Sequence, residues 1–406
     1  MRGIINEILA DIRQFSDTFI SLSVARYIHK GKGRDPTLVR SYRRIQVGTL
    51  CQKFIQRLVE YQCTSVVSAH AVPNQWGFTA GTSFLQCPVV RETLTKLSIE
   101  KKTPLFCVAA DVQSAFSRTD RICQLYENFS QGEFGKIFLF SKAFASNTDV
   151  VLNCNGEYSE RFTEHQGAPQ GSSRSSGSWK NYSVALYKSI ENSGIGATFY
   201  GLSFGQELIA DDSLAMTTNR HRFKLMNTLY MSYAEEYRVT YEFSKLELNL
   251  WGVNNPEEQA KDLEFGGYKH TISEQSVHVG LVICQDDKKT VEANVNRRLS
   301  KTNARTWQLM SKCWSRNRTI HVTVHRELIR AVTKPMLLSG LQAVTIPDTG
   351  LKPLVRYQDK MVRKTACVRK SSSVILLEMI LQITPLVVDY HKNVISLLYN
   401  IWVTRG

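Results

Sequence analysis

Two adjacent aspartates interrupt an otherwise apolar stretch, and this feature restricts more than any other how the chain can fold. The stretch is QELIADDSLAM, residues 206–216, in which Asp211 and Asp212 separate two short strand-like runs. A strand that turns tightly into its neighbour would carry both carboxylates at the tip of a hairpin. Aspartate is also a common turn residue, so turn chemistry alone explains most such pairs.

A second carboxylate at a strand end lies 100 residues earlier. In PLFCVAADVQSAFSRTD an apolar run ends at Asp111, and a helical pattern follows. One strand-end carboxylate and a hairpin-tip pair can together hold two divalent cations roughly 3.5–4 Å apart, as phosphoryl transfer requires. Asp111, Asp211 and Asp212 therefore predict a site for two Mg²⁺ ions, for which Mn²⁺ can substitute.

The rest of the sequence has an α+β pattern in three regions. Residues 1–104 are basic and mostly helical in pattern, and a basic loop over 29–45 interrupts them. From 105 to 285, short apolar strand-like runs alternate with helical stretches at 176–192 and 220–237. Beyond residue 286 the pattern is helical and basic, so we expect a helical C-terminal subdomain.

Charge and cysteine content narrow the class of protein. The 51 Lys and Arg residues exceed the 36 Asp and Glu residues, which gives a net charge of +15 and favours a polyanionic partner such as nucleic acid. The nine cysteines include no CxxC pair, which indicates free thiols and not a zinc site or a disulfide framework.

No segment of the sequence reads as a secretion signal or a membrane span. Asp11, Arg13 and Asp17 break up the N-terminal region, and the apolar run over 373–388 carries Glu378 and Pro385 and is too short to cross a bilayer. We expect a protein of the cytoplasm, the nucleus or both, neither secreted nor membrane-bound. Its oligomeric state cannot be predicted from these patterns.

Seven short motifs follow one another in a recognisable order. They are HKGKGRDPTLVRSYRRIQV, NQWGFTAGTS, AADVQSAFSRTD, HQGAPQGSSRSS, IADDS, TYEFSKLELNLWG and SVHVGLVI. Together they resemble the reverse transcriptases of non-LTR (LINE-like) retrotransposons, from about residue 20 to at least residue 310. The resemblance implies a right-hand polymerase fold with fingers, a palm whose antiparallel sheet packs on helices, and a helical thumb.

The family's organisation can be transferred to this chain by the positions of the motifs. It implies fingers over residues 1–104 and a palm over 105–285, with an insertion around 112–160 that contributes to the fingers. Residues 286–406 would form the helical thumb and the C-terminal region.

The resemblance also implies catalytic roles. Asp111, the backbone carbonyl of Val112, and one or both of Asp211 and Asp212 would hold the two Mg²⁺ ions. Lys245, in the TYEFSKLELNLWG motif, would protonate pyrophosphate as it leaves.

Five further residues match positions that bind the incoming nucleotide in the family. By resemblance, Lys30 and Arg43 grip the triphosphate, and Phe116 lies below the sugar and disfavours a 2′-hydroxyl. Gln170 contacts the nucleotide, and Gly171 belongs to the glycines that permit close approach of the backbone. The implied partners are an RNA template, a DNA primer and dNTPs.

Several positions depart from the family pattern, namely Thr79, Thr82, Ser117, Arg174 and Ile209. The arginine stands where the family has leucine. Two functions therefore remain open. One is an active RNA-directed DNA polymerase of a retrotransposon, and the other is a decayed or domesticated reverse-transcriptase fold that binds RNA or an RNA/DNA hybrid without catalysis.

The segments on either side of the polymerase motifs indicate where the sequence comes from. The family's endonuclease domain and zinc knuckle are not recognisable, so we expect a truncated or decayed element copy or a domesticated gene. Group II intron maturases and telomerase share the implied fold. We favour them less, because neither the maturase C-terminal domain nor telomerase-specific flanks are recognisable in the sequence.

Overall fold

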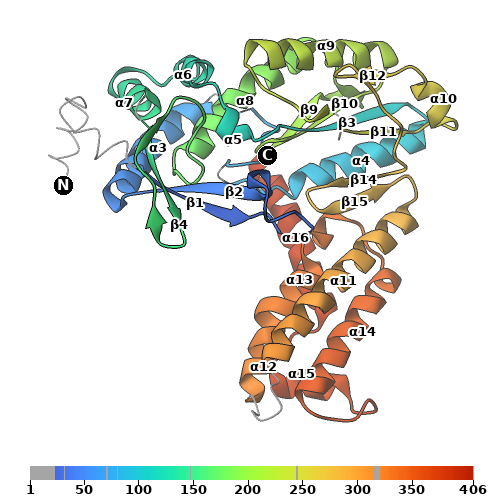
Figure 1. Cartoon of the computed structure of the whole chain (residues 1–406). Helices are drawn as coiled ribbons and strands as arrows, with labels where there is room; N and C mark the ends of the chain where they lie inside the picture. The colour runs from blue at the N-terminus through green and yellow to red at the C-terminus, as the bar shows by residue number, and fades with distance from the viewer. Residues whose placement is uncertain are drawn as a thin grey trace. The chain divides into compact units, whose positions relative to one another are not determined.

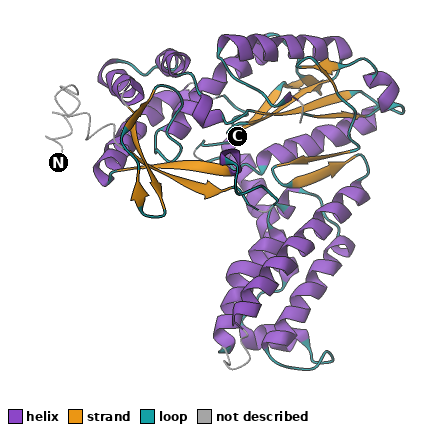
Figure 2. Ribbon diagram, viewed as in Figure 1, coloured by secondary structure: helices purple, strands orange, loops and turns teal. Residues whose placement is uncertain are grey.

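The computed structural model describes residues 23–31, 33–69, 72–79, 81–146, 148–243, 246–313 and 321–405. The chain divides into two compact units. Unit 1 draws on the segments up to Thr79, Phe106–Leu248 and Ala260–Thr271. Unit 2 draws on Ala80–Leu105, Asn249–Gln259 and the segment from Ile272 onward. Helices and strands are mixed in the described part of the chain, as Figure 2 shows, and the α+β class expected from the sequence is confirmed.

A four-stranded sheet carries the acidic motifs. Its strand order is β11-β3-β10-β9, and its strands are β3 (Leu105–Asp111), β9 (Gln206–Ile209), β10 (Asp212–Thr217) and β11 (Glu247–Trp251). Two helices, α8 (Ser175–Asn192) and α9 (Arg220–Glu236), pack against it (Figure 1). The two central strands are buried along most of their length, which explains their continuous apolar sequences.

A second sheet corrects the expectation that residues 1–104 are mostly helical. Residues 23–48 form an antiparallel hairpin of β1 (Ser23–His29) and β2 (Tyr42–Gly48). The sheet is completed by β4 (Thr148–Cys154), β5 (Glu157–Tyr158) and β6 (Phe162–Glu164). SVARYIH and YRRIQVG are rich in β-branched and aromatic residues, and β1 pairs in parallel with the distant β4.

Helices cover the rest of unit 1. They are α3 (Leu50–Ala69), α5 (Ala115–Arg118), α6 (Arg121–Ser130) and α7 (Gly135–Ser146). Helix α6 begins at a capping residue, because Asp120 Oδ1 accepts hydrogen bonds from the backbone N–H groups of Ile122 and Cys123. Short elements complete the unit: η1 (Val39–Ser41), β7 (Ala197–Phe199), β8 (Leu202–Phe204), β12 (Glu264–Phe265) and β13 (Tyr268–Lys269).

The described part of unit 2 is mostly helical, and it also contains one hairpin and the last residues of β11. Its helices are α4 (Gln86–Lys101), α11 (Asp287–Cys313), α12 (Val322–Leu328), α13 (Lys334–Leu338), α14 (Asp348–Thr365), α15 (Val374–Leu381) and α16 (Leu386–Arg405). A π-helical turn η3 (Ile329–Thr333) and a 3-10 turn η4 (Leu341–Ala343) connect some of them, and β14 (Gln275–His278) pairs with β15 (Leu281–Cys284). Short helix α10 (Pro256–Ala260) adjoins this unit. The helical pattern expected beyond residue 286 is present.

The division into two compact units does not determine where fingers, palm and thumb would begin and end. The boundaries at residues 104 and 285 therefore stay predictions. Among the described residues, no single helix is long and apolar enough to cross a membrane. Helices α15 and α16 together pass a test of length and composition, but they are bent by 64° at their junction.

Candidate active site

The register of two neighbouring strands places two of the candidate carboxylates side by side. Strands β3 and β10 are antiparallel, and Asp212 pairs directly with Asp111. Side chains at directly opposed positions of an antiparallel pair leave the same face, with Cβ atoms about 4.5–5.5 Å apart. The hairpin thus brings together two residues that lie about 100 positions apart in the sequence.

The third carboxylate lies in the turn itself. Strand β9 ends at Ile209 and β10 begins at Asp212, so Ala210 and Asp211 form a two-residue hairpin loop. Ala210 has a φ of 58°, a conformation that costs energy for any residue other than glycine and needs support from its surroundings. The indole Nε1–H of Trp179, on α8, supplies part of this support by donating to the Ala210 carbonyl at 2.9 Å.

The QWGF segment gives further support from the edge of the sheet. The N–H of Trp76 donates to the Leu208 carbonyl at 2.8 Å, and the N–H of Leu208 donates to the Asn74 carbonyl at 2.9 Å. A Cβ atom at Gly77 would lie 2.2 Å from the Ala210 nitrogen. Only glycine fits at this crossing, which explains the motif in physical terms and connects it to the aspartate turn.

The backbone after Asp111 supplies a candidate carbonyl ligand. Glu242 N–H donates to the Asp111 carbonyl at 3.0 Å, and Gln113 N–H donates to the Thr240 carbonyl at 2.8 Å. Val112 forms the antiparallel bridge with Tyr241 between these two bonds. In this pattern the N–H and C=O of Val112 point away from Tyr241, toward the side of β3 on which β10 lies.

These groups line one pocket of about 810 Å³, which we call the aspartate pocket. Eight of the candidate residues lie in its wall: Lys30, Arg43, Asp111, Val112, Phe116, Gln170, Asp211 and Asp212. Gly171 lies directly after Gln170 in the loop behind this wall. Lys245 falls outside the described residues, so its predicted role stays a prediction.

Cations from the β1–β2 hairpin also line the aspartate pocket. Lys30, Arg34 and Arg43 line it, and Arg43 acts electrostatically on Asp211. Burial and the charges of Arg34 and Arg43 lower the pKa of Lys30. Arg44 also lines the pocket, but its guanidinium forms a two-pronged ion pair with Glu164. The aspartate pocket therefore holds a group of cations together with the aspartates, a suitable arrangement for a metal-bound polyphosphate.

Phe116 lies in an aromatic stack beside the aspartates. Its ring is 6.4 Å from that of Phe78 in an edge-on arrangement and 5.8 Å from that of Trp179. Trp179 also supports the hairpin tip, so one side chain connects the predicted sugar gate to the aspartate turn. The sequence did not single out Trp179, because neither contact is local.

The Gly-x-Pro-Gln-Gly loop is held between two backbones. The Gln46 N–H on β2 donates to the Gln170 carbonyl at 2.7 Å, and the Ala168 N–H donates to the Phe116 carbonyl at 2.6 Å. Gly171 has a φ of 120°, and a Cβ atom there would lie 2.4 Å from the Gln46 carbonyl oxygen. Glycine is therefore required here by the approach of β2, and the nucleotide-binding role of Gly171 stays a prediction.

A second residue that sequence reasoning missed is Arg121. Its guanidinium donates to the carbonyls of Gly167 at 2.8 Å, Ala145 at 2.8 Å and Glu164 at 2.6 Å. It thereby fixes the loop that leads into the Gly-x-Pro-Gln-Gly motif. A single arginine near a helix start gives no sequence signal for such a role, because its acceptors are distant backbone atoms.

The electrostatics of the aspartates fit a divalent cation. Burial, and then the charges of Asp211 and Asp111, raise the pKa of Asp212 to about 6. Burial also raises the pKa of Asp211, and Arg43 opposes that shift. Carboxylates that repel one another in a partly buried site are relieved by a bound cation.

Within the described residues, no three side chains of His, Cys, Asp or Glu lie close enough to hold one metal ion. The protein ligands for a cation would therefore be the opposed carboxylates of Asp111 and Asp212 together with the Val112 carbonyl, with Asp211 beside them. Hard oxygen donors of this kind suit Mg²⁺, which keeps several coordination positions for water and phosphate.

A pH and metal dependence of stability follows for Asp212. Its folded-state pKa of about 6 lies above the ordinary value of 3.8, so the folded protein holds the extra proton. Stability therefore falls as pH rises between these values. Asp212 is also exposed to solvent, and screening reduces the effect. We therefore expect Asp212→Asn to raise the free energy of unfolding by about 1 kcal/mol at neutral pH.

Thermal unfolding at about pH 4 and at neutral pH, with and without Mg²⁺, checks this expectation. The gain from Asp212→Asn should vanish at the acidic pH, and Mg²⁺ should stabilise the wild type much more than the variant. An equal response of both proteins to Mg²⁺ would contradict the placement of the cation.

Trp179 gives a prediction about the hairpin tip. Trp179→Phe retains an aromatic ring against Phe116 but removes the donor to the Ala210 carbonyl, and we expect a loss of about 1–2 kcal/mol. Urea unfolding followed by circular dichroism measures the change, with Trp307→Phe as the matched control because Trp307 is half exposed. Equal stability of the two variants would show that the indole N–H does not support the turn.

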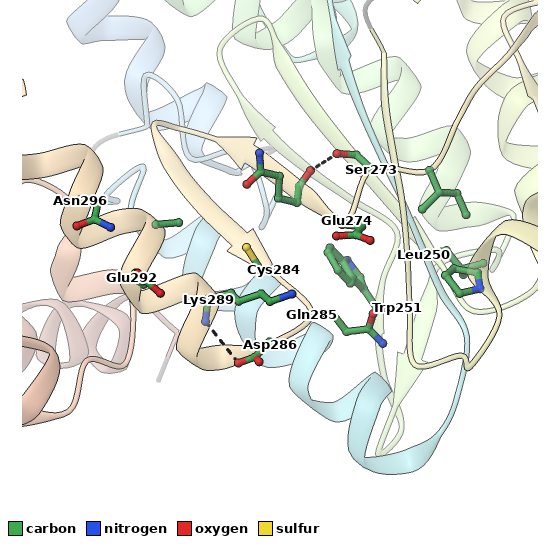
Figure 3. Close-up of a pocket in the computed structure, with 14 residues that line it drawn as sticks. Leu250, Trp251, Ser273, Glu274, Cys284, Gln285, Asp286, Lys289, Glu292 and Asn296 are labelled. Carbon is green, nitrogen blue, oxygen red and sulfur yellow. Dashed lines mark hydrogen bonds between the residues drawn. The ribbon is translucent and has the colours of Figure 1, made fainter. Parts of the chain in front are cut away.

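A separate pocket of about 590 Å³ lies in unit 2 (Figure 3). It lies beside the ends of β11 and β15 and the first turns of α11, and its wall carries charges of both signs: Glu274, Asp286, Lys289 and Glu292. None of the motif residues that match the family's metal-binding or nucleotide-binding positions lines it. We assign the candidate active site to the aspartate pocket.

Comparison with known proteins identifies the fold. No protein-family model and no curated protein matches the sequence. Telomerase from Candida albicans, in complex with a TWJ fragment of telomeric RNA, is similar with a TM-score of 0.51 and 11% identity, over 87% of this chain and 64% of that one. Apo telomerase from Candida tropicalis, truncated from its C-terminal domain, gives a TM-score of 0.47 and 14% identity, over 66% of this chain and 54% of that one.

The chain spans less than two thirds of the length of these two telomerase chains. The likeness to the Candida albicans structure shows that the chain has a right-hand polymerase fold of the reverse-transcriptase kind. At 11% identity it shows the fold alone.

Proposed function

We propose that this chain is a reverse transcriptase, a nucleotidyltransferase that extends a primer 3′-hydroxyl with dNTPs on an RNA template. One observation carries the proposal: Asp111 and Asp212 are directly paired across β3 and β10 in a pocket that Lys30, Arg34 and Arg43 also line. Paired carboxylates that share a pocket with several cations suit a metal-bound triphosphate.

Divalent cations bound in the aspartate pocket would supply part of the chemistry. Bound Mg²⁺ ions would lower the pKa of the attacking hydroxyl and neutralise the charge that develops on the leaving pyrophosphate. Asp111, Asp212 and the Val112 carbonyl would hold these ions, with Asp211 beside them. Cation binding by this set is consistent with the pKa of Asp212, which burial and then the charges of Asp211 and Asp111 raise.

The chain's own residues bind and orient the nucleotide. Lys30, Arg34 and Arg43 would stabilise the β- and γ-phosphate charges from the hairpin side. Phe116, packed against Phe78 and Trp179, would support the sugar and exclude a 2′-hydroxyl. Gln170 would contact the nucleotide from a loop whose backbone is fixed to β2.

The charge of α11 and the likeness to a telomerase support binding of the RNA template. Helix α11 carries the cluster Arg297, Arg298 and Lys301. Burial, and then the charges of Arg297 and Arg298, lower the pKa of Lys301. Such a cluster would contact the phosphates of an RNA/DNA duplex without reading sequence and with strong salt dependence. The Candida albicans telomerase was solved with telomeric RNA, which supports RNA as a partner here. The motif resemblance further suggests a non-LTR retrotransposon as the source.

Primer extension tests the proposal. The wild-type chain is incubated with dNTPs and Mg²⁺ or Mn²⁺ on an oligo(dT) primer annealed to poly(rA), and in parallel to poly(dA). We expect extension on the RNA template that requires the divalent ion. Binding of the hybrid without extension under either ion would overturn the polymerase and favour the alternative, a decayed or domesticated protein that binds RNA/DNA hybrids.

A further inference from the structure

Helix α16 is apolar on two opposite faces. One face packs into the core of unit 2 through Leu386, Tyr390 and Leu397, each at most 5% exposed. The other face is exposed and also apolar. A contiguous exposed apolar face on a helix whose other face lies in the core marks a surface that a partner covers.

The outer face has a regular spacing, and we call it the α16 stripe. It consists of Val388, Ile395, Leu398, Tyr399, Trp402 and Val403, each at least 53% exposed. Val388, Ile395 and Trp402 recur every seven residues, and Leu398 lies three residues after Ile395. Three a positions and one d position of a seven-residue repeat are thus apolar and exposed, which is a spacing suited to packing against another helix, while His391 occupies the preceding d position.

Helix α15, which precedes it, extends the apolar surface. Its exposed side carries Ile375, Leu376, Met379 and Ile380, while its acidic residue Glu378 is buried and accepts a hydrogen bond from Gln358. The usual amphipathic arrangement is thus reversed in α15. Together the two helices expose on the order of 1,000 Å² of apolar surface, against roughly 300–600 Å² for the largest patch of a typical monomer.

We propose that the α16 stripe is the interface of a homodimer, in which two copies of α16 pack antiparallel about a two-fold axis near Ile395. The six side chains of the stripe, each at least 53% exposed, offer an area of about the 800 Å² that each partner contributes to a stable interface. An isologous interface uses the same face twice, so the seven-residue spacing of one copy meets the same spacing of the other.

Charge selects a second copy as the occupant. Between Val388 and Val403 the acidic residue Asp389 is paired with Lys334 on α13, and Lys392 is the remaining fixed charge. In an antiparallel pair centred on Ile395 the two Lys392 residues lie on opposite sides of the axis, about 9 Å apart along the helices, where salt screens much of their repulsion. The neighbouring polar residues are His391, which lies 3.8 Å from Asp348 on α14, and the uncharged Ser396 and Asn400. The stripe therefore has a single lysine beside it and no cluster of basic residues for anionic lipid.

Sedimentation velocity of the full chain over a wide concentration range tests the proposal. We expect a dimer for wild type, and at least about 100-fold weaker association for Ile395→Asp and for Trp402→Asp. Ile122→Asp is the matched control, because Ile122 is an exposed apolar residue on α6, outside the stripe. A monomeric wild type, with or without binding to phosphatidylserine vesicles, overturns the proposal, and so does a dimer that both variants leave intact.

Cysteine crosslinking tests the antiparallel arrangement, and circular dichroism confirms that each variant is folded. Ile395→Cys should crosslink to itself above the wild-type background. Val388→Cys should crosslink with Trp402→Cys when the two variants are mixed, and each alone should not. Crosslinking of each variant to itself would instead indicate a parallel pair and overturn the two-fold packing.

Discussion

Asp212→Asn is expected to reduce primer extension by at least about 10³-fold without loss of folding. The substitution preserves the size of the side chain and removes one of two carboxylates that face each other across β3 and β10. Because repulsion from Asp211 and Asp111 contributes to the raised pKa of Asp212, removing its charge relieves the fold while it removes a cation ligand. Activity and stability should therefore change in opposite directions.

A single-turnover extension assay with saturating dNTP and Mg²⁺ measures this loss, and thermal unfolding of the same samples measures stability. Asp262→Asn is the control, because it removes the same charge from a residue that does not line the aspartate pocket. Asp111→Asn should match Asp212→Asn. If extension by Asp212→Asn stays within a few-fold of the control, the opposed carboxylates are not the catalytic centre, whatever the wild-type activity.

Local patterns were enough to predict much of the aspartate site. The apolar run that ends at Asp111 and the runs on either side of Asp211 and Asp212 predicted the strands. The short interval of two aspartates between the last two runs predicted the hairpin. The pairing of Asp212 with Asp111 follows once both strands join one sheet. Turn chemistry and apolar runs are local, so a single sequence contains them.

Contacts that are distant in sequence could not be predicted in the same way. The β1–β2 hairpin was expected to be helical or loop, and its strand character depends partly on pairing with β4, more than 100 residues away. Trp179 and Arg121 act on carbonyl groups of other segments, so their residue types carry no information about their partners. The motif resemblance located the loops, and the three-dimensional structure supplied the groups that hold them.

The second large effect concerns Arg174, at a position where the family has leucine. Arg174 is 2% exposed, yet its guanidinium pairs with Glu133 and, at 3.2 Å, with Glu60, and it donates to Ser141 Oγ at 2.8 Å. Burial acts to lower its pKa, but Glu133, Cys63 and Glu60 outweigh burial, so the net shift is upward. The arginine therefore remains charged in the interior.

Arg174→Leu restores the family residue but leaves Glu133 buried without its cation, and we expect a loss of about 3–5 kcal/mol. Urea unfolding measures it, with Arg330→Leu as the control, because that arginine belongs to an exposed ion pair worth less than about 1 kcal/mol.

The double variant Arg174→Leu, Glu133→Gln separates an unpaired charge from poor packing. It should recover much of the loss if the buried charge is responsible, and none of it if leucine simply fits badly. Recovery would mean that two acidic residues, 41 and 114 positions away in the sequence, compensate for the arginine that replaces the family's leucine. A substitution matched in this way preserves a folded protein, so Arg174 by itself does not favour the decayed alternative over the polymerase.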